Sequence, residues 1–326
     1  MMKKLSILIG LALVASTALL SAQDITNRYS MKLKEVEEGK YELLSPKKYK
    51  YINLAEVPDL LVPYEPQNFV SSKLYKDCVS EDYVYKTYPD YELVLTVDKA
   101  VSEQPAPFMV YIHGGGWARG TRESNKSLSK YLAVQNGIAG VRISYTLADK
   151  PNASVEVTAQ DVEDAVKWVQ EHAAELGINP DVFGFCGASA GGHLSGLAAM
   201  TIKGAKVLVG YAGIYDLTTA AITTRAKDPQ RLAYFKDLAP SVLKKNSPQY
   251  RIPKKNLPAA MLVCGTGDSV VEYTQSKEFA AALTAKGGVV EYLEYQYYDH
   301  NISSKKSDKA GEIFYKTVDF VVEHLK

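Results

Sequence analysis

The side chain with the clearest potential for chemistry lies in the stretch Gly187-Ala188-Ser189-Ala190-Gly191. This stretch fits the pattern G-x-S-x-G, follows the apolar run VFGFC at 182–186 and precedes a helical pattern. Small residues around the serine permit a tight strand-to-helix turn that exposes its hydroxyl. A serine held in this way can attack a carbonyl carbon, so the pattern indicates acyl transfer with Ser189 as the nucleophile. The competing interpretation is that the small residues only let two backbones pack closely.

A second glycine-rich stretch, HGGGW at 113–117, ends the apolar run FMVYI. Three consecutive glycines leave their backbone N–H groups unobstructed, as the stabilisation of a tetrahedral oxyanion requires. A phosphate-binding loop is disfavoured because neither G-x-G-x-x-G spacing nor a following Lys-Ser/Thr pair is present. His113 is either a general base or a brace for this loop, and its place directly before the glycines favours the brace.

A serine nucleophile needs a base, and the chain has 5 histidines. Three of them are poorly placed: His172 lies in the polar stretch of a long helical pattern, His324 lies in the last turn of the chain, and His193 follows the serine by four residues on a helix that points it away from the hydroxyl. His113 and His300 remain. His300 follows the strand pattern VVEYLEYQYYD, so it lies at a strand carboxyl end on the same rim as Ser189, and we take it as the base.

The base needs a carboxylate that fixes its tautomer. Asp268, in CGTGDSVV, closes the preceding strand pattern and completes the chain order Ser, Asp, His that accompanies this type of serine turn. Three other carboxylates are rivals for the role: Asp216, Glu272 and Asp299. Asp216 also ends a strand, but one strand too early in the chain, and is better placed to support a cap, so Asp268 is the preferred acid.

The elements that position these residues alternate between strands and helices from about residue 82 onward. The segments DYVYKTY and YELVLTVD predict an antiparallel hairpin, and the continuous apolar runs after them predict strands buried on both faces. The segment 124–137 predicts a helix with Ser124 as its cap and Gly137 at its end. We therefore expect an α/β fold with a mostly parallel, doubly wound sheet, whose ligands bind at the strand carboxyl ends.

Three segments lie outside that alternation. Residues 1–22 combine Lys3 and Lys4 with an apolar core and small residues up to Ala22, which predicts a cleavable signal peptide and a periplasmic or secreted protein. Residues 23–80 form a polar extension of unknown role that could wrap the domain or extend one wall of a site. The α/β domain is expected over 81–326, with a small cap inserted at about 217–256.

The composition is that of an ordinary globular protein, with 46% hydrophobic and 23% charged residues and a formal net charge of +1. This balance does not point to nucleic acid or to an anionic membrane surface, and no stable membrane anchor is expected. The 3 cysteines show no metal-ligand spacing and cannot build a disulfide framework. No metal site is expected.

From about residue 82 onward the chain resembles the α/β-hydrolases of the esterase group related to hormone-sensitive lipase. It is similar in particular to exported bacterial acetyl and feruloyl esterases that act on carbohydrates. The segments that carry the resemblance are HGGGW, GASAGGHL, GTGD and the DH at 299–300. The resemblance implies the catalytic set Ser189, Asp268 and His300, an oxyanion hole at the backbone N–H groups of Gly115, Gly116 and Ala190, and no cofactor.

The expected function is therefore an exported serine ester hydrolase that removes acetyl, other short or aromatic acyl groups from small or oligosaccharide esters. Three alternatives remain open: a general short-chain carboxylesterase or lipase, a serine peptidase of the same fold, and a binding module without activity. The sequence leaves the oligomeric state open.

Overall fold

A computed structural model describes residues 28–29, 33–37, 40–43, 64, 68–219, 234–235 and 238–326. The segment predicted as a signal peptide lies outside the described residues, as do most of the extension at 23–80 and part of the cap segment at 217–256. Among the described residues, no helix combines the length and the hydropathy that a membrane span requires.

An eight-stranded sheet forms the centre of the molecule, with the strand order β10-β9-β8-β7-β5-β6-β4-β3. The strands are β3 (Ser80–Tyr88), β4 (Tyr91–Asp98), β5 (Ala106–Ile112), β6 (Ala139–Ile143), β7 (Ile178–Ala188), β8 (Ala205–Tyr211), β9 (Ala259–Gly265) and β10 (Val290–Tyr295). Strands from β6 to β10 pair in parallel, whereas β3 and β4 form the predicted antiparallel hairpin. A separate two-stranded sheet consists of β1 (Leu33–Glu37) and β2 (Lys40–Leu43).

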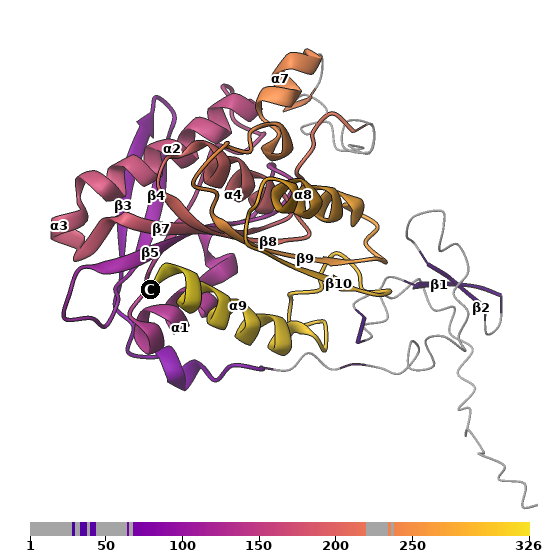
Figure 1. Cartoon of the computed structure of the whole chain (residues 1–326), viewed down its shortest axis with the longest axis horizontal. Coiled ribbons are helices and arrows are strands. Elements are labelled where there is room, and N and C mark those ends of the chain that lie inside the picture. The colour runs from indigo at the N-terminus through magenta and orange to yellow at the C-terminus, as the bar shows by residue number, and fades with distance from the viewer. Residues whose placement is uncertain are drawn as a thin grey trace, which may run out of the picture.

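Helices cover both faces of the large sheet (Figure 1). On one face lie α2 (Val155–Glu171), α4 (Ala190–Thr201) and α8 (Thr274–Ala285), and on the other lie α1 (Lys126–Asn136) and α9 (Ala310–Leu325). The short helices are α3 (Ala173–Leu176), α7 (Pro240–Lys245) and the 3₁₀ turns η2 (Ser72–Tyr75), η3 (Arg122–Asn125) and η4 (Pro248–Tyr250).

The central strands are apolar throughout because successive side chains enter two different cores. In β5, Phe108, Val110 and Ile112 pack on the side of α2 and α4, while Met109 and Tyr111 pack on the side of α1 and α9. A strand that is buried on both faces loses the alternation of a half-exposed strand. This explains the uninterrupted apolar runs that predicted the parallel, doubly wound sheet.

The predicted helix at 124–137 is correct at its end and wrong at its start. Gly137 adopts a left-handed conformation (φ 62°) and terminates α1 as expected. The helix begins only at Lys126, however, after the 3₁₀ turn η3, and Asn125 precedes it without a side-chain cap. The Ser124 hydroxyl donates instead to the carbonyl of Thr121, within the turn.

Candidate active site

Ser189 lies between β7 and α4 in a backbone conformation that non-glycine residues rarely adopt, with φ 57° and ψ −121°. Such a conformation costs about 1–3 kcal/mol and persists only where the surroundings impose it. Here a Cβ on Gly187 would overlap the carbonyl oxygen of Gly191, and a Cβ on Gly191 would overlap that of Ile112. The close approach of the backbones and the exposure of the serine hydroxyl, which the sequence offered as alternatives, therefore both follow from the same turn.

The side chains of Asp268 and His300 are joined by a hydrogen bond of 2.7 Å between Oδ2 and Nδ1. Asp268 is 2% exposed, and its other oxygen, Oδ1, accepts from the backbone N–H groups of Val270 (2.7 Å) and Val271 (2.8 Å). A carboxylate accepts from Nδ1 of the imidazole in this arrangement, and in the neutral ring that donates at Nδ1 the Nε2 atom carries no proton. This is the tautomer that a general base requires.

A cavity of about 730 Å³ brings the predicted residues together. Ser189 and His300 both line it, together with three residues of the glycine loop: Gly114, Gly115 and Gly116. Gly115 and Gly116 both have positive φ, at 113° and 63°, which suits glycine at these positions. Ala190 is the first residue of α4 and is buried, so its N–H belongs to the helix N-terminus next to Ser189.

His113 braces the glycine loop. Its Nδ1 lies 2.8 Å from the carbonyl oxygen of Gly114, and its ring stacks on Tyr145 with 4.3 Å between ring centroids. The Tyr145 hydroxyl in turn donates to the His113 carbonyl. Burial lowers the pKa of His113, so the neutral ring is favoured. These contacts engage His113 within the loop.

His193 connects the glycine loop to the described end of the cap segment. It accepts a hydrogen bond from the indole N–H of Trp117 at Nδ1 (3.3 Å), and its Nε2 donates to the carbonyl of Asn246 (2.7 Å). Trp117 also packs against Tyr234 and Phe235. Burial lowers the pKa of His193 to about 4. Both ring nitrogens are engaged away from Ser189.

The rival carboxylates make other contacts. Asp216 accepts from the backbone N–H and hydroxyl of Thr218 and from the hydroxyl of Tyr250, so it holds the start of the cap segment. Glu272 is exposed and lines a separate cavity of about 180 Å³. Asp299 is buried, and its carboxylate accepts from the backbone N–H of His300 rather than from the ring. Burial raises the pKa of Asp299 to about 6.

The described walls of the cavity come from other segments than the expected cap. No described residue of 217–256 lines the cavity. Its walls come from Phe69, from residues 119–128 and from residues 300–314, including Phe314 on α9. The rings of Phe69 and Phe314 are 5.5 Å apart. Sequence reasoning missed Phe69, although an apolar Phe-Val pair in an otherwise polar extension is a signal for burial.

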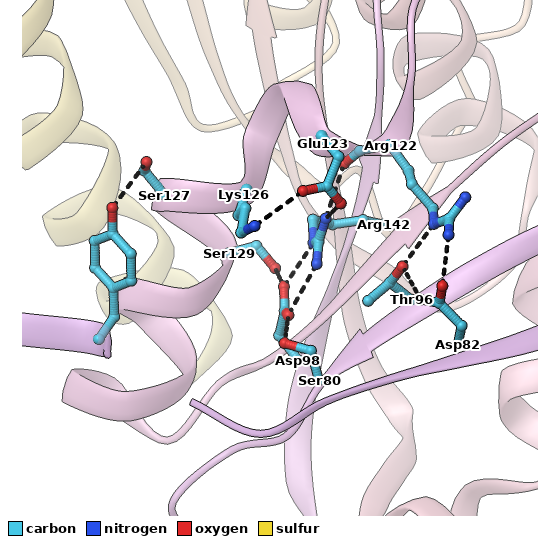
Figure 2. A network of polar contacts seen from close by, with 11 residues as sticks. Ser80, Asp82, Thr96, Asp98, Arg122, Glu123, Lys126, Ser127, Ser129 and Arg142 are labelled. Atoms are coloured by element: carbon cyan, nitrogen blue, oxygen red, sulfur yellow. Dashed lines mark hydrogen bonds and ion pairs between the residues drawn. The ribbon is translucent and has the colours of Figure 1, made fainter. Parts of the chain in front are cut away.

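A buried ionic network positions the wall formed by η3 and α1 (Figure 2). Arg142, on β6, donates to the fully buried Asp98 of β4 from Nε (2.7 Å) and Nη2 (3.1 Å) and to Glu123 of η3 from Nη1 (2.5 Å). Asp98 also accepts from the hydroxyl of Ser129 on α1. The network thus ties the segment after the glycine loop to the sheet.

The strand order, the strained serine turn after β7 and the acid–histidine pair after β9 and β10 define an α/β-hydrolase fold. Solved structures of the same fold include Thermogutta terrifontis esterase 2 phosphorylated by paraoxon, with a TM-score of 0.64 and 22% identity; the match covers 75% of this chain and 94% of that one. Residues 96–283 match the BD-FAE family model, which is more than half of the chain. The chain belongs to the BD-FAE family.

The curated relatives of this chain include esterases. Esterase LipC of Mycobacterium tuberculosis is 26% identical over 234 residues, which is 65% of this chain and 57% of the relative. Esterase LipQ of the same organism is 30% identical over 210 residues, which is 58% of this chain and 48% of the relative. The chain thus spans about half the length of the curated relatives it matches.

Proposed function

We propose that this protein is a serine carboxylic ester hydrolase with Ser189 as nucleophile, His300 as general base and Asp268 as the acid that orients the base. The observation that carries the proposal is the 2.7 Å contact between Asp268 and His300 beside a strained serine in the same cavity. The esterases among its relatives support the same reaction class.

In the proposed mechanism, Oγ of Ser189 attacks the ester carbonyl while Nε2 of His300 takes its proton. The backbone N–H groups of Gly115, Gly116 and Ala190 stabilise the oxyanion of the tetrahedral intermediate, and one such donor contributes about 3–4 kcal/mol. The C–O bond then breaks, and His300 returns the proton to the leaving alcohol. Water repeats the sequence on the acyl-enzyme and releases the acid, while Asp268 stays ionised.

The proposed substrates are acetyl, other short or aromatic acyl esters of carbohydrates. Polar side chains around the cavity suit sugar hydroxyls, among them Ser124, Asn125 and Asn301, while Phe69 and Phe314 offer an apolar wall to an acyl group. A general short-chain carboxylesterase is the alternative. Both substrate classes fit this cavity, since no apolar lid covers it among the described residues.

The test is a chain-length series of p-nitrophenyl esters, run beside acetylated xylan and methyl ferulate. Release of acetate from acetylated xylan or of ferulate from methyl ferulate is the expected result, and a preference for acyl chains of eight or more carbons would overturn the substrate class. Ser189→Ala should abolish p-nitrophenyl acetate hydrolysis, and retained turnover would refute the nucleophile. Paraoxon should label the wild-type serine and leave Ser189→Ala unlabelled, as mass spectrometry can show.

We also propose export through cleavage after Ala22, on the basis of the charged, apolar and small-residue pattern of 1–22. Expression of the full chain in a bacterium that secretes should yield a periplasmic or secreted protein whose N-terminus is Gln23. A cytoplasmic product that retains residues 1–22 would contradict the proposal.

A further inference from the structure

The active-site cavity has a one-sided charge distribution at its mouth. Among the described residues that line it are two cationic side chains, Arg119 and Lys305, and no Asp or Glu. Both cations are exposed, and neither forms an ion pair within the described part of the chain. Arg119 belongs to the loop that follows the glycines, and Lys305 to the loop that follows His300.

The carboxylates nearest to these cations along the chain are engaged elsewhere. Glu123 lies 2.5 Å from Arg142 and 3.1 Å from Lys126. The Glu123 carboxylate accepts a hydrogen bond from the buried guanidinium of Arg142, as Figure 2 shows, and so pairs with a residue of the sheet. Glu123 therefore leaves the charge of Arg119 uncompensated at the cavity.

The same holds on the other loop. Asp308 accepts from the hydroxyl of Tyr298 (2.5 Å) and lies 3.8 Å from Arg28. Glu312 lies 2.9 Å from Lys309 and accepts from the hydroxyl of Tyr295. The carboxylates of Asp308 and Glu312 thus have partners outside the cavity lining, while the buried Asp299 accepts from the backbone N–H of His300.

Two uncompensated cations at the mouth of a cleft create a positive potential that attracts and orients anions. Because Arg119 and Lys305 line the same cavity as Ser189, a group that they hold lies in that cavity. Neutral hydrogen-bonding side chains accompany them, including Ser127, Ser303 and Ser304. An ester that carries a carboxylate and hydroxyl groups matches this combination.

We propose that the preferred ester carries a carboxylate apart from its ester bond, as an acylated acidic sugar does, and that Arg119 and Lys305 bind this carboxylate. The inference rests on the proposed ester hydrolase function and specifies its substrate class. The carboxylate can belong to the alcohol or to the acyl part of the ester, and the two arms of the experiment separate these sources.

One arm compares 4-acetoxybenzoate with neutral 4-acetoxybenzamide, so that the charge is on the leaving alcohol. The other compares the p-nitrophenyl half-ester of terephthalic acid with its 4-carbamoyl analogue, so that the charge is on the acyl group. In each arm the measured quantity is the ratio of kcat/KM for the charged ester to that for the neutral one. Intrinsic reactivity cancels when this ratio is compared between wild type and variants.

Arg119→Gln and Lys305→Gln should each lower the ratio about threefold in at least one arm, and the double variant about tenfold, as expected for exposed ion pairs. The change should be mainly in KM, and added salt should weaken the wild-type preference. Lys306→Gln is the matched control, since Lys306 is also exposed and does not line the cavity. Its ratio should stay that of wild type.

The two levels of the proposal fail in different ways. If neither the charged nor the neutral ester is hydrolysed, the proposed function itself is wrong. If both are hydrolysed and the double variant leaves the ratio unchanged in both arms, the esterase stands and the anionic substrate is refuted. An equal fall in the Lys306→Gln ratio would likewise refute it, because the effect would then come from net charge and not from the two named side chains.

Discussion

Replacement of Asp268 by Asn tests the acid of the proposed catalytic set, and the structure determines how the new side chain must sit. Oδ1 of Asp268 faces two backbone donors, the N–H groups of Val270 and Val271, at 2.7 and 2.8 Å. An NH₂ group there would face two donors and leave both unpaired, which costs about 1–3 kcal/mol for each buried group. The amide oxygen therefore stays on these donors.

The NH₂ group of the new asparagine then occupies the position of the Asp268 Oδ2 atom, which is 2.7 Å from Nδ1 of His300. Nδ1 must accept this hydrogen bond, so the ring proton moves to Nε2, the atom that has to take the proton from Ser189. The substitution therefore selects the wrong tautomer while keeping the shape of the site. A loss of about 10⁴-fold in kcat is expected for such a change, or about 5.5 kcal/mol of transition-state stabilisation.

The assay is the steady-state hydrolysis of p-nitrophenyl acetate, with thermal melting to verify that Asp268→Asn is folded. Asp216→Asn is the matched control, because Asp216 also follows a strand but pairs with Thr218 and Tyr250. It should keep kcat near that of wild type. A loss of less than tenfold for Asp268→Asn, or a large loss for Asp216→Asn in its place, would refute the assignment of the acid.

Three further predictions concern stability. Ser189→Gly should be about 1 kcal/mol more stable to urea than Ser189→Ala, because only glycine relaxes the strain at φ 57°; equal stability would refute stored strain. Asp98→Asn should lower the free energy of unfolding by about 3–5 kcal/mol, since it removes the buried one of the two carboxylates that pair with the Arg142 guanidinium. Asp82→Asn, at an exposed ion pair, should lower it by less than about 1 kcal/mol; similar losses for the two variants would contradict this. Burial lowers the pKa of His193 from 6.5 to about 4, so the imidazole of His193 binds a proton more tightly in the unfolded chain than in the folded one. The unfolding free energy should therefore fall as the pH drops from about 6.5 toward 4, and His193→Gln should flatten that part of the urea-midpoint curve.

The parts of the fold that could be predicted are those that local pattern determines. The runs FMVYI, VFGFC and AAMLVC became β5, β7 and β9 because a strand buried on both faces must be apolar throughout. The sites at their carboxyl ends followed from the same logic, since parallel strands deliver their following residues to one edge. The hydrogen bond between Asp268 and His300 thus joins residues that sequence order and strand ends had already placed together.

The start of α1 could not be predicted because a tertiary interaction determines it. Serine is a residue type that often caps helices, but Glu123, next to Ser124, accepts a hydrogen bond from the buried Arg142. That contact keeps 122–125 in a 3₁₀ turn, and the α-helix begins only afterwards. Propensity is a weak guide where a charged group buried elsewhere in the fold requires a partner.

The net charge of the chain conceals the property that distinguishes the active-site cavity. With 38 basic and 37 acidic residues, the composition provides no reason to expect an anionic substrate. The positive charge at the cavity arises from the tertiary structure, because the carboxylates of Glu123, Asp308 and Glu312 form ion pairs or hydrogen bonds with residues outside the cavity lining. Arg119 and Lys305, which have no such partners in the described part of the chain, line the cavity beside Ser189. Selectivity for a charged substrate therefore depends on which charged side chains at the active-site cavity lack an ion-pair partner. The tertiary contacts of the fold determine this, and the number of charged residues in the sequence does not show it.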